Sequence, residues 1–206
     1  MYLSRIKLNT SLKKTMRALV NPNLIHGALD SAEAGERTRK LWRIDTLKGE
    51  CYLLVLSENR LDLTSVTEQF GFMDSIETKS YDGFLERIVE GSKWRFKIKA
   101  NPTIKKYDEK KGKSVSLAHI TTKHQMSWLL DRALSNGFEI TEDSFLVTES
   151  KWYDFHKRSS GDNVKLLAVT YEGILTVTDV DLFKKMLTSG IGREKAYGLG
   201  MLTIVK

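Results

Sequence analysis

The sequence has little of the chemistry that cysteine and proline bring to a protein, with one cysteine, Cys51, and two prolines in 206 residues. One thiol cannot form an internal disulfide or a cysteine-based zinc or iron–sulfur site, which predicts a reducing, cytoplasmic setting. No apolar run approaches the roughly 20 residues of a membrane-spanning helix, and the first eight residues alternate in polarity instead of forming a signal-peptide core. We therefore expect a soluble protein that is not exported and has no membrane partner.

Charge is plentiful and unbalanced. The chain has 33 lysines and arginines against 26 aspartates and glutamates, a formal net charge of +7. Such an excess favours a polyanionic partner, and nucleic acid is the first candidate. A generally basic surface without a specific partner is the alternative.

Polarity patterns divide the chain into two similar halves. The first half predicts a strand over residues 1–8, helices over 12–20 and 22–29, a hairpin over 40–57, a short helix within 61–72 and a weak strand over 74–81. Asp30 to Glu33 resembles a capping box that would begin a further helical turn. The periodicity fades over residues 83–91 and restarts at Lys93, which predicts domains at 1–88 and 93–206.

The second half repeats the order of the first. It predicts a strand over 93–100, a lysine-rich loop, a helix over 121–135, strand signals over 138–149, a hairpin over 152–168 whose second strand continues to 177, a helix over 180–187 and a last strand over 201–205. Both halves approximate β-α-β-β-α-β. We therefore predict the α+β class, with two tandem ferredoxin-like domains of the kind on which RNA-recognition domains are built.

His26 is the best catalytic candidate among four histidines. On the second predicted helix, Leu24 and Leu29 belong to the apolar arc, which leaves His26 and Asn23 as neighbours on the polar face. An exposed imidazole can take or give a proton near neutral pH. An idle surface histidine is the alternative.

Several groups of cations suit a phosphate backbone. One predicted strand has four cations that alternate with apolar residues: Lys93, Arg95, Lys97 and Lys99. The lysine-rich loop contains Lys105 and Lys106, and the region near the tip of the second hairpin contains His156, Lys157 and Arg158. A flat strand face or a hairpin can follow a nucleic-acid groove, so we predict RNA contacts at all of them. A solvated sheet face is the alternative for the row of four.

A glycine-rich segment precedes the last predicted strand. Its glycines are Gly190, Gly192, Gly198 and Gly200, and Arg193 and Lys195 lie among them. A dinucleotide-binding fingerprint requires a strand before and a helix after its glycines, and here the order is reversed. Backbone N–H groups of such a loop can approach phosphates, with the two cations adding charge. Glycines that only satisfy turn geometry are the alternative.

Metal and cofactor chemistry find no support in the residue pattern. No histidine pair stands at ligand spacing with a carboxylate nearby, so we predict neither a metal site nor a cofactor. Asp30, Glu33 and Glu36 share a predicted helical face, where capping and solvation account for them.

Four passages carry a resemblance to a known family. They are MYLS at the start, RFKIKANPTIK over 95–105, YEGIL over 171–175, and GIG at 190–192 followed by GLGML over 198–202. With these passages in the same order and at the expected separations, the whole chain resembles the CasE-type CRISPR repeat-processing endoribonucleases of the type I-E system, within the RAMP superfamily.

The resemblance implies an activity and a set of partners. It implies two ferredoxin-like domains that bind the stem-loop of a CRISPR repeat in precursor RNA, cut at its 3′ base without metal, and keep the product bound among the other subunits of the Cascade complex. His26 matches the catalytic histidine of that family, Lys157 and Arg158 match the hairpin that enters the RNA major groove, and Gly192, Lys195, Gly198 and Gly200 match its glycine-rich loop. Some members carry a tyrosine where this chain has Asn23, so the partner of His26 is an open question.

The chemistry of RNA fits this inventory, because RNA supplies its own nucleophile in the 2′-OH. Its attack on the adjacent phosphate gives a 2′,3′-cyclic phosphate and a 5′-OH, and the protein need only align groups, move protons and stabilise charge. His26 would act as general base or general acid, Asn23 would orient a group, and a cation from the glycine-rich loop or from Lys13, Lys14 and Arg17 would offset the charge. Two alternatives remain: a non-catalytic RNA-binding subunit and a nucleotide-dependent enzyme.

Overall fold

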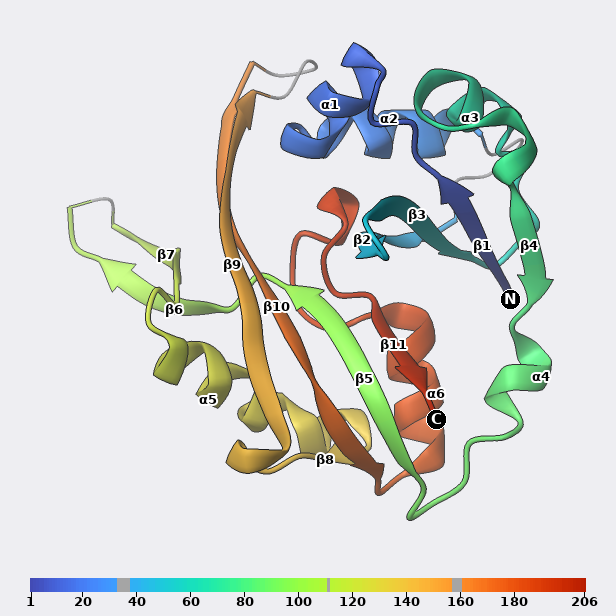
Figure 1. Ribbon diagram of the computed structural model, residues 1–206. Coiled ribbons are helices and arrows are strands. Elements are labelled where there is room, and N and C mark those ends of the chain that lie inside the picture. Colours follow the sequence, from blue (N-terminus) through green and yellow to red (C-terminus); the bar gives the residue numbers. More distant parts are fainter. Residues whose placement is uncertain (33–37, 111, 157–160) are drawn as a thin grey trace.

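The computed structural model describes residues 1–32, 38–110, 112–156 and 161–206. Its two main sheets contact each other, and every strand pair described within them is antiparallel (Figure 1). Among the described residues, no helix combines the length and the apolar character that crossing a membrane requires.

The N-terminal sheet has the strand order β2-β3-β1-β4. In chain order its elements are β1 (Tyr2–Lys7), α1 (Lys13–Val20), α2 (Asn23–Ser31), β2 (Leu41–Leu47), β3 (Glu50–Ser57), α3 (Thr64–Phe70) and β4 (Glu77–Ser80). This is the β-α-β-β-α-β order with the first strand between the third and the fourth. A short helix, α4 (Asp82–Leu85), leads to the second sheet.

The C-terminal sheet has the order β11-β5-β10-β8, and β9 pairs with β10 on the same edge as β8. Its elements are β5 (Lys93–Ala100), α5 (Thr122–Ala133), β8 (Phe138–Glu139), β9 (Phe145–His156), β10 (Asn163–Val177), α6 (Val180–Ser189) and β11 (Leu202–Val205). The first strand again lies between the third and the fourth. The predicted fold class, two ferredoxin-like units, is thus confirmed.

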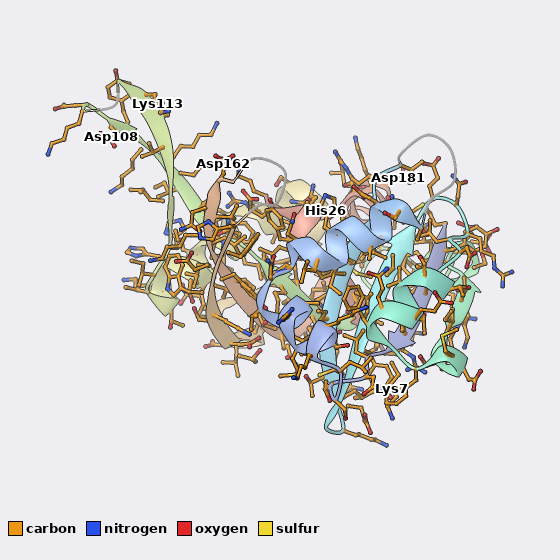
Figure 2. All side chains as sticks on the ribbon, turned by 90° about the horizontal axis from the view of Figure 1, so that it is seen from above. Lys7, His26, Asp108, Lys113, Asp162 and Asp181 are labelled. Carbon is orange, nitrogen blue, oxygen red and sulfur yellow. The ribbon has the colours of Figure 1, made fainter. Side chains whose placement is uncertain are left out.

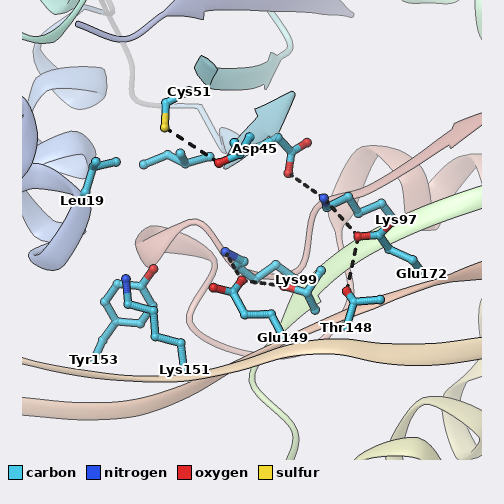
Figure 3. Close-up of a pocket in the computed structure, with 13 residues that line it drawn as sticks. Leu19, Asp45, Cys51, Lys97, Lys99, Thr148, Glu149, Lys151, Tyr153 and Glu172 are labelled. Carbon is cyan, nitrogen blue, oxygen red and sulfur yellow. Dashed lines mark hydrogen bonds and ion pairs between the residues drawn. The ribbon is translucent and has the colours of Figure 1, made fainter. Parts of the chain in front are cut away.

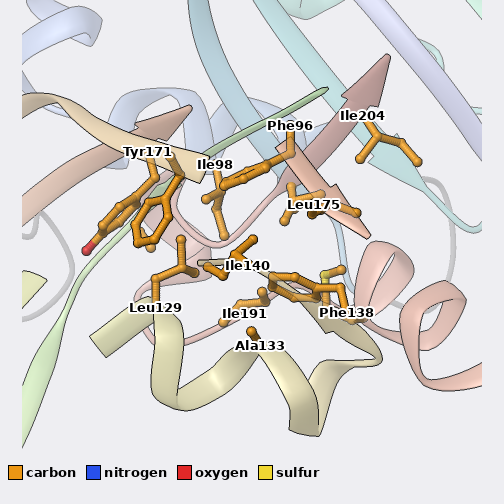
Figure 4. Close-up of a cluster of buried hydrophobic side chains, with 14 of the residues drawn as sticks. Phe96, Ile98, Leu129, Ala133, Phe138, Ile140, Tyr171, Leu175, Ile191 and Ile204 are labelled. Atoms are coloured by element: carbon orange, nitrogen blue, oxygen red, sulfur yellow. The ribbon is translucent and has the colours of Figure 1, made fainter. Parts of the chain in front are cut away.

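Each sheet buries its apolar face under its own helices. In the C-terminal half, Phe96 and Ile98 of β5 pack with Leu129 of α5 and Phe183 of α6 (Figure 4). A separate cluster joins Ile6 of β1 to residues of α2, β3 and α3. Burying a large apolar side chain contributes roughly 1.5–3 kcal/mol, so these clusters hold the helices in place.

The two sheets meet through a small apolar cluster and one buried cation. Leu41, Leu56 and Tyr81 from the N-terminal half surround Met201, which follows the glycine-rich segment. Beside them Arg43 of β2, with a side chain 1% exposed, donates hydrogen bonds to the carbonyl oxygens of Lys97 and Met201, each at 2.8 Å. These contacts hold Met201, the residue that follows the glycine-rich segment, against the N-terminal sheet.

The structure corrects three predicted elements. The lysine-rich loop is instead a separate hairpin of β6 (Thr103–Asp108) and β7 (Lys113–Ala118), which projects beside β9 and β10 (Figure 1). Ser31 ends α2, so the predicted capping box begins no helix over the described residues; Glu33 and Glu36 lie outside them. The strand predicted over 138–149 is divided into β8 and a much longer β9.

Candidate active site

His26 lies on α2 and faces the glycine-rich segment (Figure 2). Its side chain is 36% exposed, and its ring meets the ring of Tyr197 edge to face at a centroid distance of 6.5 Å. Ile25, Ala28 and Leu29 of the same helix are buried, which fixes the direction in which the imidazole points. Helical spacing therefore predicted correctly that His26 lies off the apolar face.

The His26 pocket, about 300 Å³ in volume, contains residues from three separate parts of the chain. Its lining includes His26, Asp30, Arg39, Lys40, Trp42 and Lys195. Among the described lining residues, three cations face one carboxylate, so their charges sum to a positive value even when the imidazole is neutral. A phosphate group would find both a proton-transfer group and several cations within this space.

Asp30 pairs with two other residues that line this pocket, His26 and Lys40. His26 Nε2 lies 3.7 Å from Asp30 Oδ2, and Lys40 Nζ lies 3.8 Å from Asp30 Oδ1. Asp30 thus holds the imidazole and one ammonium on the same side of α2, a role that sequence reasoning missed by assigning it to capping. The adjacent cations Arg39 and Lys40 were also missed, although the basic run at 37–40 was a signal for them.

Lys195 has an unusual electrostatic environment. Burial and the nearby charge of Arg39 hold the pKa of its ammonium below the ordinary lysine value. A cation in such a place is destabilised in the free protein and would be stabilised by a bound anion. The sequence predicted that a cation from the glycine-rich loop or from α1 would serve the reaction. Lys195 of the loop lines the His26 pocket, whereas Lys14 and Arg17 line a different pocket.

Asn23 is not brought together with His26. It lines that second pocket with Lys14, Arg17 and Gln69. The two residues are separated by three positions on α2, but their side chains serve different cavities. A direct role for Asn23 in the reaction remains a prediction.

Two cations of the predicted row on β5, Lys97 and Lys99, line a cavity between the two sheets, about 430 Å³ in volume (Figure 3). There Lys97 Nζ lies 3.1 Å from Glu172 Oε1, and Lys99 Nζ lies 3.2 Å from Glu149 Oε2. Burial raises the pKa of Glu149, but the charges of Lys99 and Lys151 and the hydrogen bonds from Lys99 and Thr170 together outweigh burial and leave the pKa below its ordinary value. Carboxylates therefore neutralise the two inner cations of the row.

The outer two cations of the row, the two lysines predicted in the lysine-rich loop and His156 lie at the surface. Lys93 and Arg95 are exposed on β5, and Arg95 donates to the carbonyl oxygen of Lys206 at 3.1 Å. Lys105 and Lys106 are exposed on the projecting hairpin, and His156 is exposed at the end of β9. Lys157 and Arg158 lie outside the described residues. RNA contact at each of these remains a prediction.

Packing explains much of the glycine-rich loop. A Cβ on Gly198, at φ +77°, would lie 2.6 Å from the ring of Trp42, and one on Gly200 would meet the carbonyl oxygen of Ile191. Both glycines are buried. Gly190 and Gly192 also have positive φ values, and Gly192 is exposed. The loop therefore requires glycine to fit against its neighbours, and a phosphate contact at any of the four remains a prediction.

Metal-ligating side chains do not gather anywhere in the described ranges. No group of three or more histidines, cysteines, aspartates or glutamates is placed there to hold an ion.

Comparisons with known proteins cover the whole chain. The model of the family described as CRISPR associated protein matches residues 1–206. A CRISPR-associated endoribonuclease Cse3 of Thermus thermophilus is 29% identical over 217 residues, with 99% of each chain covered. The CRISPR system Cascade subunit CasE of Escherichia coli is 32% identical over 116 residues, which cover 53% of this chain and 56% of that one.

A solved structure extends these matches to three dimensions. The structure of CRISPR endoribonuclease Cse3 bound to a 19-nucleotide RNA superposes with a TM-score of 0.80, at 26% identity and with 100% of both chains covered. The CasE-type resemblance expected from the motifs is thereby confirmed. The chain belongs to the CRISPR associated protein family.

Proposed function

We propose that this chain is an endoribonuclease that binds the repeat stem-loop in precursor CRISPR RNA, cuts at the 3′ base of the stem and keeps the product within a Cascade complex. The names of the similar proteins support the activity and the assembly. Within this proposal the chain has two domains, residues 1–88 and 93–206, and works in the cytoplasm, where its RNA substrate is made.

One observation carries the assignment of the site. His26 of the N-terminal half and Lys195 of the C-terminal half line the same pocket, which only the folded arrangement of both halves can form. A bound phosphate would sit between an imidazole and an ammonium whose pKa is held down in the free protein. Phosphate binding relieves that destabilisation.

The reaction follows from the groups present. The substrate's 2′-OH attacks the adjacent phosphorus, and the 5′-oxygen leaves as a 5′-OH. Imidazole can accept the proton of the 2′-OH or donate one to the leaving oxygen. Lys195 and Arg39 face the negative charge that grows on the phosphate oxygens, where preorganised cations lower the barrier.

The basic surfaces would hold the RNA around this pocket. The projecting β6–β7 hairpin presents Lys105 and Lys106, and β9 carries His156 toward the segment that contains Lys157 and Arg158. Contacts of this kind bind phosphates and set the register of the substrate.

Cleavage of repeat RNA in EDTA, with and without a 2′-deoxy sugar at the cut site, tests the proposal. We expect the ribose substrate to be cut and the deoxy substrate to remain whole. His26→Ala should lower the cleavage rate by about 10²–10⁴-fold, the usual contribution of a general acid or base, with little change in stem-loop affinity.

His124→Ala provides the matched control, because that histidine is exposed at the start of α5 and does not line the His26 pocket. It should cut like the unaltered protein. Cleavage of the deoxy substrate would contradict the mechanism. Tight binding without any cutting by the unaltered protein would favour the alternative of a non-catalytic RNA-binding subunit.

A further inference from the structure

Another pocket, here called the Trp152 pocket, shares the glycine-rich loop with the His26 pocket. It is about 340 Å³ in volume and lies between the β6–β7 hairpin, the β9–β10 pair and the loop. Its polar and aromatic lining includes Asn101, Ser116, Trp152, Lys165, Arg193 and Glu194. The catalytic scheme above uses none of these side chains.

The two pockets are joined by consecutive residues of one loop. Glu194 lines the Trp152 pocket, and the next residue, Lys195, lines the His26 pocket. Glu194 has a φ of +62°, a left-handed conformation that reverses the chain direction at this point. Adjacent Cα atoms are only about 3.8 Å apart, so the two pockets adjoin each other at this point of the loop.

Trp152 is the exposed aromatic surface of this pocket. Its side chain is 45% exposed, although indole is among the side chains that gain most from burial. Lys165 Nζ lies 5.4 Å from the ring centroid, near the outer limit of a cation–π contact, and can leave the ring to pair with a phosphate. A partly exposed indole with a cation beside it is the arrangement that binds an unstacked base and its phosphate.

Polar groups beside the indole add donors and an unsatisfied acceptor. Arg193 Nη1 donates to Ser116 Oγ at 2.6 Å, and a guanidinium has five N–H donors in all. Asn101 is 7% exposed, and its Oδ1 has no hydrogen-bond partner within the described part of the chain. A buried acceptor without a partner is costly, and because less than 1 Å² of this atom is accessible, the amino group of a base would reach it only once the Asn101 side chain turns toward the pocket.

We propose that the Trp152 pocket binds an unpaired nucleotide of the substrate RNA next to the cut phosphate, with its base stacked on the indole. The inference rests on the proposed function, because the bound nucleotide belongs to the RNA strand that continues from the phosphate in the His26 pocket. Base stacking on an aromatic side chain contributes about 1–3 kcal/mol and tolerates any base, so this pocket adds affinity for a single-stranded flank.

A fluorescent base analogue can detect the stacking directly. Repeat RNA carrying a 2′-deoxy sugar at the cut site would have 2-aminopurine at each unpaired position beside the stem, one position at a time. We expect quenching at one position with the unaltered protein and with Trp152→Phe, and none there with Trp152→Ala. The alanine variant should bind flanked RNA about 5- to 150-fold more weakly and a bare stem-loop normally.

Phe72→Ala is the matched control, since Phe72 is 44% exposed in the N-terminal half and does not line the Trp152 pocket. It should leave the quenching unchanged. Equal affinity of Trp152→Ala and the unaltered protein for flanked RNA would overturn the inference, as would an equal loss on the bare stem-loop. Cleavage of unmodified RNA by the unaltered protein is measured in parallel, so failure of the proposed function is seen separately from failure of the stacking.

Discussion

The guanidinium of Arg43 on β2 donates a hydrogen bond to the carbonyl oxygen of Met201 at 2.8 Å, across the contact between the two sheets. The same side chain donates to both carboxylate oxygens of Asp45 and to Thr203 Oγ1. Met201 directly follows the glycine-rich loop that presents Lys195. The placement of Lys195 in the His26 pocket therefore depends on a buried arginine whose hydrogen bonds go to other residues.

Replacing Arg43 by alanine should strongly destabilise the protein. The change leaves Asp45, 16% exposed, without its main partner and frees the carbonyl oxygens of Lys97 and Met201. Breaking a buried ion pair from one side costs about 3–5 kcal/mol. We expect a loss of that size in the free energy of unfolding, measured by urea denaturation.

Arg5→Ala is the matched control for this loss. Arg5 also pairs with a carboxylate, Glu77, at 2.7 Å, but the two side chains are 41% and 55% exposed. Exposed ion pairs contribute about 0–1 kcal/mol, so this variant should change little. Similar losses in the two variants would show that the buried Arg43 network contributes no more to the free energy of unfolding than an exposed ion pair does.

Gly198→Ala should disturb both folding and cleavage. The added methyl group would meet the Trp42 ring at 2.6 Å in a left-handed conformation. The conformation alone costs roughly 1–2 kcal/mol, and overpacking adds about 1–3 kcal/mol. Because Trp42 also lines the His26 pocket, the cleavage rate should fall in a single-turnover assay even where the protein is fully folded.

Gly49→Ala separates strain from clash. Gly49 has nearly the same φ, +79°, but a Cβ there would meet nothing within 4 Å. It should lose only the conformational part of the stability and none of the activity. If both variants lose the same stability, contact with Trp42 does not determine the shape of the loop.

Strand and helix periodicity predicted much of this molecule because that signal is local. The alternation of Trp94, Phe96 and Ile98 with cations is what the structure shows in β5. The partners of those cations could not be predicted in the same way, because Glu149 and Glu172 come from strands far along the chain. Lysines and arginines in a sequence predict a basic surface. Folding can bring carboxylates next to them, and the resulting ion pairs neutralise that surface.

The lysine-rich segment shows how composition can hide a pattern. Ile104 and Leu117 are paired across the β6–β7 hairpin, yet both are more than 40% exposed. A strand whose two faces are exposed needs no apolar alternation, so the lysines suggested a loop. The site had the same difficulty in another form: helical spacing brings His26 and Asp30 together on α2, whereas Arg39 and Lys195 join them only through tertiary contacts.

Lys195→Met should stabilise the free protein while it slows the reaction. The pKa of Lys195 is below its ordinary value, so the charged form is disfavoured in the folded state and its cost is present at neutral pH. That cost disappears as the pH rises toward 10.5, where the unfolded lysine also loses its proton. We expect a higher Tm for the variant at pH 7 and a smaller difference at higher pH.

The same variant should cut repeat RNA about 10²–10³-fold more slowly, the usual effect of removing one charge-stabilising group. Lys185→Met is the control, since Lys185 is exposed on α6 and does not line the His26 pocket. It should alter neither Tm nor cleavage. A lower Tm for Lys195→Met at pH 7 would show that its ammonium is not destabilised in the fold.

The salt dependence of RNA binding should distinguish exposed cations from neutralised ones. Each phosphate contact contributes roughly 0.7–0.9 to the slope of log K against log salt concentration, because binding releases condensed counterions. Lys105 is exposed on the projecting hairpin, whereas Lys99 pairs with Glu149 at 3.2 Å and is 15% exposed. Lys105→Ala should therefore reduce the slope by nearly one unit, and Lys99→Ala should leave it almost unchanged, when non-cleavable repeat RNA is titrated over a series of KCl concentrations.

Equal reductions would mean that Lys99 exchanges Glu149 for a phosphate and that the cavity between the sheets opens to RNA. An unchanged slope for Lys105→Ala would remove the β6–β7 hairpin from the RNA-binding surface.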